Sequence, residues 1–127
     1  MTEMLIEATN AAGCLRWHRV CRLDDLEDAW GEAALVAGTQ VALFRLSAAE
    51  VYAVSHRDPA TGSHVMARGI TGSKTVDSCG ERATVASPLH KQVYDLVTGE
   101  CYTSATLHLQ TFPIQVVDGF VEVGVAA

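Results

Sequence analysis

The stretch VASPLHKQVYDLVTGE, residues Val85–Glu100, decides which fold we expect for this chain. It combines a loop that offers a histidine, His90, with a short strand and a tight turn that ends at Gly99. The loop holds Ser87, Pro88, Leu89 and His90, and its shape suggests a metal-ligand loop in which Pro88 fixes φ and stiffens the turn. Ser87 stands where such a loop would need a thiolate. The stretch therefore predicts a loop of the metal-binding type on a β scaffold, but without the cysteine thiolate that would bind the metal.

The composition indicates one globular domain. The chain has 127 residues, 49% apolar and 19% charged, which suffices for a buried core without cross-links. Its formal net charge of -6 argues against nucleic acid and against an anionic membrane surface as partners. The N-terminus lacks the pattern of a secretion signal, and no apolar run reaches the roughly 20 residues that span a bilayer. We expect a cytoplasmic protein.

The four cysteines do not suggest a disulfide framework. They are Cys14, Cys21, Cys79 and Cys101, and no two of them form a C-x-x-C pair. In a reducing cytosol they are most simply free thiols, and Cys21 fits a small apolar packing position.

Short β-branched or aromatic runs between turn residues predict an all-β domain over residues 15–127, after a flexible N-terminal arm over residues 1–14. Asp118-Gly119 separates two such runs and predicts a hairpin, because both central residues of a type I′ turn need positive φ. Segments Ala67–Gly72 and Asp77–Glu81 are rich in turn residues. The expected strands are Leu15–Cys21, Ala33–Ala37, Gln40–Leu46, Val51–Val54, Arg82–Ala86, Gln92–Leu96, Pro113–Val117 and Phe120–Val125.

Many short strands without a long helix predict a small antiparallel sandwich or barrel. Loops His56–Ser63 and Ser87–Lys91 interrupt the pattern. If the strands that precede them lie side by side, both loops reach the same end of the domain, where a site would lie. The aromatic residues fit packing positions. Trp17 and Trp30 are expected in the core or at its edge, and Tyr52 and Tyr94 are expected to face the core with a solvated hydroxyl.

Three segments follow one another in a characteristic order: Val54-Ser55-His56, Ser87-Pro88-Leu89-His90 and Tyr94-Asp95-Leu96-Val97-Thr98-Gly99. This order resembles a Rieske domain. A Rieske centre holds one iron through two cysteine thiolates and the other through two histidines. The resemblance implies a Rieske-like [2Fe-2S] domain fold with a cluster-binding-like loop subdomain, and it places the cluster positions at Val54, His56, Ser87 and His90.

Two of the four cluster positions lack a suitable donor. Val54 has no donor atom, and the hydroxyl of Ser87 is a hard ligand that keeps its proton, whereas an iron–sulfur cluster needs thiolates. Cys79 lies outside the loop spacing and Cys101 lies beyond the hairpin. We therefore expect no cluster. The alternative metal site is a mononuclear zinc site made from His56, His64 and His90 with Asp58 or Cys79, although no ligand pair has a zinc spacing.

A second set of segments narrows the resemblance: Ala42–Arg45, Val51–Val54, Asp58-Pro59, Val65–Ile70, Ser87–Gln92 and Asp95–Gly99. With these segments the chain resembles the small subunits of assimilatory NAD(P)H-dependent nitrite reductases, a branch of the Rieske superfamily that lacks the cluster cysteines. The resemblance implies an accessory, non-catalytic subunit without a cofactor of its own. It also implies a large-subunit partner that carries sirohaem, an iron–sulfur cluster, FAD and the NAD(P)H site and reduces nitrite to ammonium in nitrate assimilation.

If no cluster is bound, loops 56–63 and 87–91 are expected to form a surface of fixed shape that the partner can contact. We expect Ser87 to hydrogen-bond the loop backbone, and Asp58, Arg68 and Lys91 to form a polar rim that contacts the large subunit, with Leu89 as an apolar anchor. No dinucleotide-binding fingerprint and no nucleophile motif suggests catalysis by this chain. Two other functions are considered: a Rieske-type electron-transfer ferredoxin with atypical ligands, and a stand-alone β interaction module.

Overall fold

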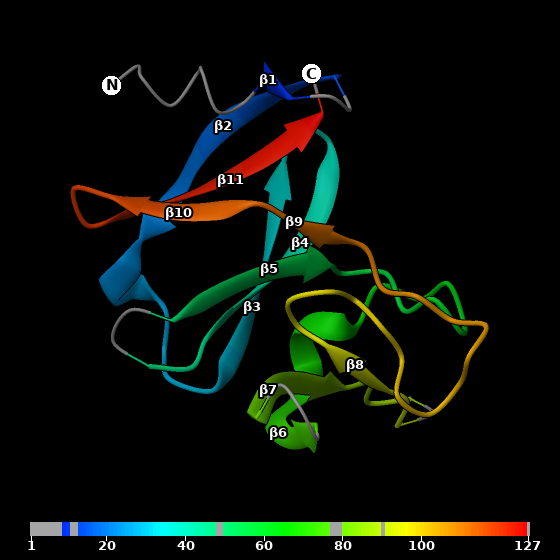
Figure 1. The fold of residues 1–127 in the computed structure, drawn as a ribbon. Helices are drawn as coiled ribbons and strands as arrows, with labels where there is room; N and C mark the ends of the chain where they lie inside the picture. The colour runs from blue at the N-terminus through cyan, green and yellow to red at the C-terminus, as the bar shows by residue number, and fades with distance from the viewer. Residues whose placement is uncertain (1–8, 11–12, 48–49, 77–79, 90, 127) are drawn as a thin grey trace.

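Two four-stranded sheets and one three-stranded sheet make up the described part of the chain (Figure 1). The computed structural model describes residues 9–10, 13–47, 50–76, 80–89 and 91–126. The sheet orders are β1-β2-β11-β10, β3-β4-β5-β9 and β6-β7-β8, and their strand pairs are antiparallel. The strands are β1 (Thr9–Asn10), β2 (Gly13–Arg22), β3 (Trp30–Val36), β4 (Thr39–Arg45), β5 (Val51–Ser55), β6 (Ile70–Val76), β7 (Gly80–Ala86), β8 (Val93–Asp95), β9 (Thr111–Phe112), β10 (Ile114–Val117) and β11 (Phe120–Ala126).

Helix is confined, in the described residues, to the 3₁₀ turns η1 (Leu23–Asp25) and η2 (Met66–Arg68). Neither is long and apolar enough to cross a bilayer. The prediction of an all-β, antiparallel domain is confirmed.

The central sheet is buried on both faces. Because side chains alternate along a strand, Val41 and Leu43 of β4 enter one core while Ala42 and Phe44 enter another. The first core lies between this sheet and β11. The second core lies on the other face of the sheet and includes residues of η2, β7 and β8. Burial on both faces explains the unbroken apolar run in β4. The second core adds Val54, Met66, Ala67, Val85, Tyr94, Leu96, Cys101 and Leu109.

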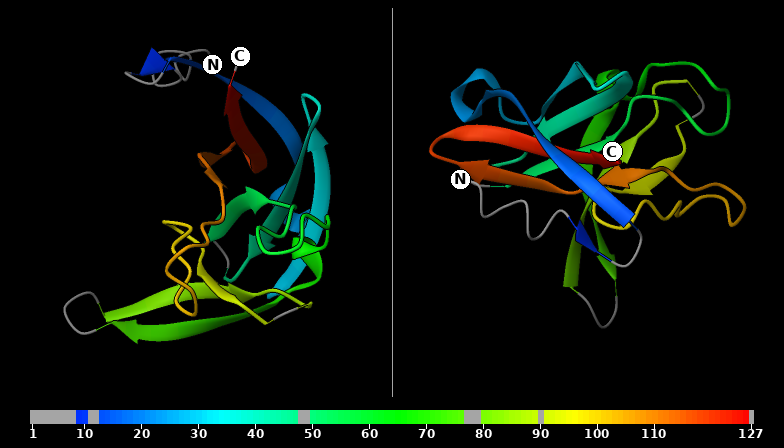
Figure 2. Two further views of the ribbon diagram at one scale, coloured as in Figure 1. Left: turned by 90° about the vertical axis from the view of Figure 1, so that its right-hand side faces the viewer. Right: turned by 90° about the horizontal axis from the view of Figure 1, so that it is seen from above.

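The β6–β7 hairpin lies at the opposite end of the molecule from β1 (Figure 2). Its seven residue pairs run from Ile70↔Ala86 to Val76↔Gly80. The sequence-based prediction of turn over Ala67–Gly72 is wrong from Ile70 onward. Gly72 has weak strand preference, and pairing with β7 overrides that local preference.

The predicted hairpin at Asp118-Gly119 is confirmed. Val117 pairs with Phe120, and the two turn residues have φ values of 52° and 80°. A second two-residue turn joins β3 to β4 through Ala37 and Gly38, with φ values of 50° and 84°. Both turns have the positive φ pair that the right-handed strand twist favours.

Strand β2 extends into the segment that the sequence assigns to the arm. Residues 1–8 and 11–12 lie outside the described residues, but Thr9 pairs with Cys14. Strand β3 begins at Trp30 rather than Ala33, because Trp30 already pairs with Arg45 of β4. The packing role expected for Trp30 is wrong, since 63% of its surface is exposed. The apolar packing expected for Cys21 is confirmed.

Candidate functional site

The two loops that the sequence singles out lie against each other. Loop 56–63 follows β5, and loop 87–91 follows β7, a strand of a different sheet. Ser87 Oγ donates a hydrogen bond of 2.5 Å to Asp58 Oδ2, and both side chains are buried. The two loops meet as expected, but the condition from which the sequence predicted it is not fulfilled, because β5 and β7 belong to different sheets.

Asp58 organises the first loop from the inside. Its Oδ1 accepts from the Ala60 N–H at 2.8 Å, and its carbonyl accepts from the Gly62 N–H at 2.7 Å. The side chain has no exposed surface. Among the three residues expected to form the polar rim, Asp58 is therefore the one that the structure places in the interior.

Ser87 organises the second loop. Its carbonyl accepts from the Lys91 N–H at 3.0 Å, and its N–H donates to the Gln92 carbonyl at 2.9 Å. Its Oγ also accepts from the Leu89 N–H at 3.3 Å. The expected bond from Ser87 to the loop backbone is thus present. Leu89 is 47% exposed, Lys91 is exposed, and His90 lies outside the described residues.

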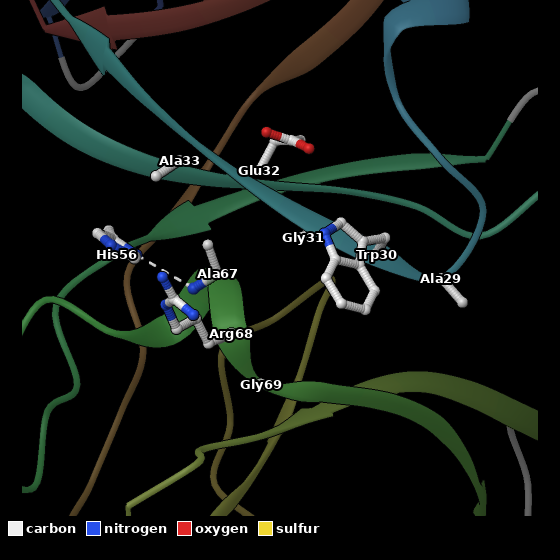
Figure 3. A pocket seen from close by; sticks show the side chains of 9 residues that line it. All are labelled: Ala29, Trp30, Gly31, Glu32, Ala33, His56, Ala67, Arg68 and Gly69. Atoms are coloured by element: carbon white, nitrogen blue, oxygen red, sulfur yellow. Dashed lines mark hydrogen bonds between the residues drawn. The ribbon is translucent and has the colours of Figure 1, made fainter.

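The imidazole ring of His56 forms a hydrogen bond with the protein backbone. Its Nδ1 accepts a hydrogen bond of 3.1 Å from the Ala67 N–H (Figure 3), which requires Nδ1 to be unprotonated. Burial, followed by the nearby His64 and Arg68, lowers the pKa of His56 below its ordinary value. The neutral ring therefore carries its proton on Nε2.

The described residues do not fit a Rieske cluster. Val54 is fully buried and has no donor atom, Ser87 Oγ is occupied by Asp58, and the Nδ1 lone pair of His56 is occupied by Ala67. A soft iron site needs thiolates at two of these positions. Two of the residues considered for a zinc site, Cys79 and His90, lie outside the described residues. Among the residues that the structure describes, no three His, Cys, Asp or Glu side chains converge.

Tyr94 lies in the core beneath the loops. Its side chain has no exposed surface, and its hydroxyl has no hydrogen-bond partner among the described residues. Burial, with smaller contributions from Cys101 and Asp58, raises the pKa of Tyr94 to about 12. The expected solvated hydroxyl is therefore wrong for Tyr94. The Tyr52 hydroxyl donates a hydrogen bond of 2.5 Å to a Glu50 carboxylate oxygen at an exposed position.

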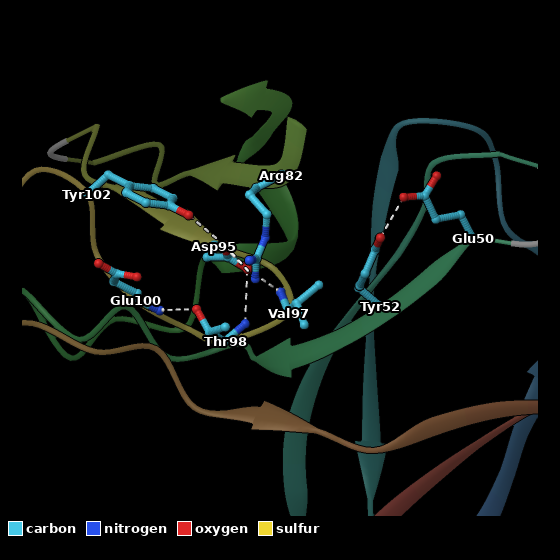
Figure 4. A network of polar contacts seen from close by, with 8 residues as sticks. All are labelled: Glu50, Tyr52, Arg82, Asp95, Val97, Thr98, Glu100 and Tyr102. Carbon is cyan, nitrogen blue, oxygen red and sulfur yellow. Dashed lines mark hydrogen bonds and ion pairs between the residues drawn. The ribbon is translucent and has the colours of Figure 1, made fainter. Parts of the chain in front are cut away.

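Asp95 supports the turn that follows β8 (Figure 4). Its Oδ1 accepts from the N–H groups of Val97 and Thr98 at 2.7 and 3.0 Å, and its Oδ2 accepts from the Tyr102 hydroxyl at 2.6 Å. Arg82 forms an ion pair with Oδ2 at 3.1 Å. Burial alone would raise the pKa of Asp95, but these bonds and the Arg82 charge lower it.

A groove lies beside His56, between the start of β3 and η2 (Figure 3). Its volume is about 470 Å³. It brings the exposed Trp30 indole together with the exposed Arg68 guanidinium, which the sequence placed at a partner-binding rim. Sequence reasoning missed Trp30, because a tryptophan in an apolar β run looks the same whether its strand lies in the core or at an edge. The lining residues are Ala29, Trp30, Gly31, Glu32, Ala33, His56, Ala67, Arg68 and Gly69.

Comparison with known proteins agrees with this fold. The sequence profile described as Rieske-like [2Fe-2S] domain matches residues 16–124. The fold and the matched residues define the chain as a Rieske-like domain protein.

Two relatives define the group more closely. The chain is 34% identical to the nitrite reductase (NADH) small subunit of Salmonella typhimurium, over 84% of this chain and 95% of that one. A crystal structure described as an NADH-dependent nitrite reductase small subunit from Mycobacterium tuberculosis superposes with a TM-score of 0.81 at 36% identity, covering 89% and 97% of the two chains. The chain belongs to the Rieske-like family of nitrite reductase small subunits.

One further relative is much longer. The nitrite reductase [NAD(P)H] large subunit of Klebsiella oxytoca is 33% identical over 108 residues, which cover 85% of this chain but 11% of that one. In that protein a domain similar to this chain is part of the large subunit.

Proposed function

We propose that this chain is the accessory small subunit of an assimilatory NAD(P)H-dependent nitrite reductase that reduces nitrite to ammonium in the cytoplasm. The large subunit carries sirohaem, an iron–sulfur cluster, FAD and the NAD(P)H site. The observation that carries the proposal is the similarity to small subunits over nearly their whole length, joined by the match inside a large subunit. A domain found both as a separate chain and fused to the large subunit is expected to act at that subunit.

We infer that the chain holds no cluster and does not relay electrons. The support is chemical: a hydrocarbon stands at one thiolate position, and at the other a hydroxyl donates to a buried carboxylate. Ser87, which stands at that second thiolate position, thus connects the two loops through a hydrogen bond. The domain acts on its partner through its surface.

Three of the predicted interface residues retain exposed surface. Arg68 in η2 and Lys91 in the second loop are exposed cations, and Leu89 is an exposed apolar side chain two residues before Lys91. A central apolar side chain with a polar rim is the usual anatomy of a protein interface. We propose that these three residues contact the large subunit.

Reconstitution tests the accessory role. Nitrite-dependent NAD(P)H oxidation and ammonium release are measured for the purified large subunit, with and without this chain. We expect the chain to increase both rates, whereas chain unfolded by heat does not. Equal rates with and without the folded chain overturn the accessory role and leave the stand-alone interaction module.

An iron and acid-labile sulfide assay tests the cluster separately. The chain is expressed with an intact cluster-assembly system, and metal, sulfide and the visible spectrum are measured under anaerobic conditions. We expect neither stoichiometric iron nor sulfide. A coloured protein with both would support the ferredoxin function instead.

A further inference from the structure

The groove between β3 and η2 carries features of a binding site. Trp30 leaves 63% of its surface in solvent, although burying a tryptophan side chain stabilises a protein strongly. Exposed aromatic side chains beside a hollow are typical anchors of protein interfaces. Ile70, which follows the groove residue Gly69 in the sequence, is also 76% exposed.

The opposite wall of the groove supplies a positive charge. Arg68 is exposed and has no ion-pair partner among the residues that the structure describes. Figure 3 shows its guanidinium near the His56 ring, and the Arg68 charge contributes to keeping that ring neutral. A guanidinium presents a planar set of N–H donors that matches a carboxylate.

The backbone fixes the distance between the two walls. A Cβ on Gly31 would lie 2.1 Å from the Ala67 carbonyl oxygen, so β3 can approach η2 this closely only with glycine at that position. The same turn is tied to the site by the bond from the Ala67 N–H to His56. Trp30 and Arg68 are therefore held on either side of a rigid backbone contact.

Glu32 is the acidic group at this groove. Figure 3 shows its carboxylate on the other side of the β3 ribbon from Arg68, and no ion pair joins the two. An incoming carboxylate would meet the guanidinium rather than Glu32. In a chain with a net charge of -6, an unpaired cation beside an exposed indole favours an acidic ligand.

We propose that this groove binds an acidic segment of the large subunit, with one carboxylate on Arg68 and an adjoining apolar side chain against Trp30. The inference rests on the proposed function, and it adds the residues, the place and the chemistry of the contact. The volume of about 470 Å³ is sufficient for a few side chains of a peptide segment.

Binding of the large subunit, loaded with its cofactors, is measured by calorimetry against the wild type and four variants. Arg68→Glu and Trp30→Ala are each expected to weaken binding about 10- to 100-fold, because each removes an interface anchor. Arg16→Glu and Leu35→Ala are matched controls: each changes an exposed residue outside the groove in the same way, and each is expected to bind like the wild type. Thermal unfolding of all variants checks that the fold is retained.

A photocrosslinking amino acid at position 30 identifies the occupant. We expect a crosslink to a large-subunit peptide that contains aspartate or glutamate. A crosslink only to a second copy of this chain, or to a large-subunit peptide without a carboxylate, would overturn the inference.

The outcomes separate the groove from the proposed function. If the wild type binds and Arg68→Glu and Trp30→Ala bind equally well, the groove is not the contact and the accessory function stands. If the wild type neither binds nor stimulates the large subunit, both the groove contact and the accessory function are wrong.

Discussion

Ser87 Oγ donates a hydrogen bond of 2.5 Å to Asp58 Oδ2 and joins two loops that lie 29 residues apart in the sequence. In a Rieske domain the corresponding loops are joined by the metal cluster. Here a hydroxyl and a carboxylate connect the two loops directly.

The Ser87→Ala variant removes this connection. Asp58 Oδ2 then remains buried without its donor, so we expect the free energy of unfolding to fall by about 2 kcal/mol. Urea unfolding followed by circular dichroism measures the change. Ser63→Ala is the control, since Ser63 is exposed, and it should change stability by less than about 0.5 kcal/mol. Equal effects of the two substitutions would show that the Ser87 bond does not stabilise the loops.

The neutral state of His56 predicts a pH dependence. The pKa of His56 is lowered in the folded protein, so below the ordinary value of 6.5 the unfolded chain binds a proton that the folded chain rejects. Stability is therefore fully present above about pH 6.5 and decreases as the pH falls toward the folded pKa. His56→Asn keeps an acceptor but does not titrate, and it should show a smaller decrease between pH 7.5 and 5.5 in urea unfolding. An unchanged pH slope in this variant would rule out His56 as the cause.

All three tyrosines of the chain should ionise late. The pKa of Tyr52 and of Tyr94 is raised to about 12 mainly by burial, and that of Tyr102 to about 12 mainly by its hydrogen bond to Asp95. The stability that these shifts provide is present below pH 10 and is lost as the pH rises toward 12. Ultraviolet titration should show little tyrosinate at pH 10.5 in the folded protein. Substantial ionisation at that pH, with the fold intact, would contradict the described environments.

Gly31→Ala tests the backbone contact at the groove. The added methyl group would collide with the Ala67 carbonyl oxygen, and backbone atoms cannot move aside cheaply. We expect a loss of about 2–4 kcal/mol in unfolding free energy together with weaker binding of the large subunit. Gly72→Ala is the control, because its Cβ would make an ordinary contact at 3.5 Å with Thr84. If Gly31→Ala is as stable as Gly72→Ala, β3 and η2 are not in rigid contact.

Local chemistry explains what could be predicted from the sequence. Asp118-Gly119 predicts its hairpin because positive φ is needed at both positions, and the structure shows it there. The absence of thiolates at positions 54 and 87 could also be predicted, because it depends only on the identities of Val54 and Ser87. By contrast, β6 was missed because its residues form a strand only when β7 is present to pair with them.

The sequence by itself determined the β class, the main hairpin and the donor atoms at the cluster positions, since each of these depends on residues close together in the chain. Only the tertiary structure decided that Asp58 points inward to Ser87, that Tyr94 is fully buried, and that Trp30 stands exposed across a groove from Arg68. Burial and pairing between distant segments depend on how the sheets pack. An aspartate or a tryptophan can be buried in one fold and exposed in another, and the packing of distant segments decides which of the two occurs.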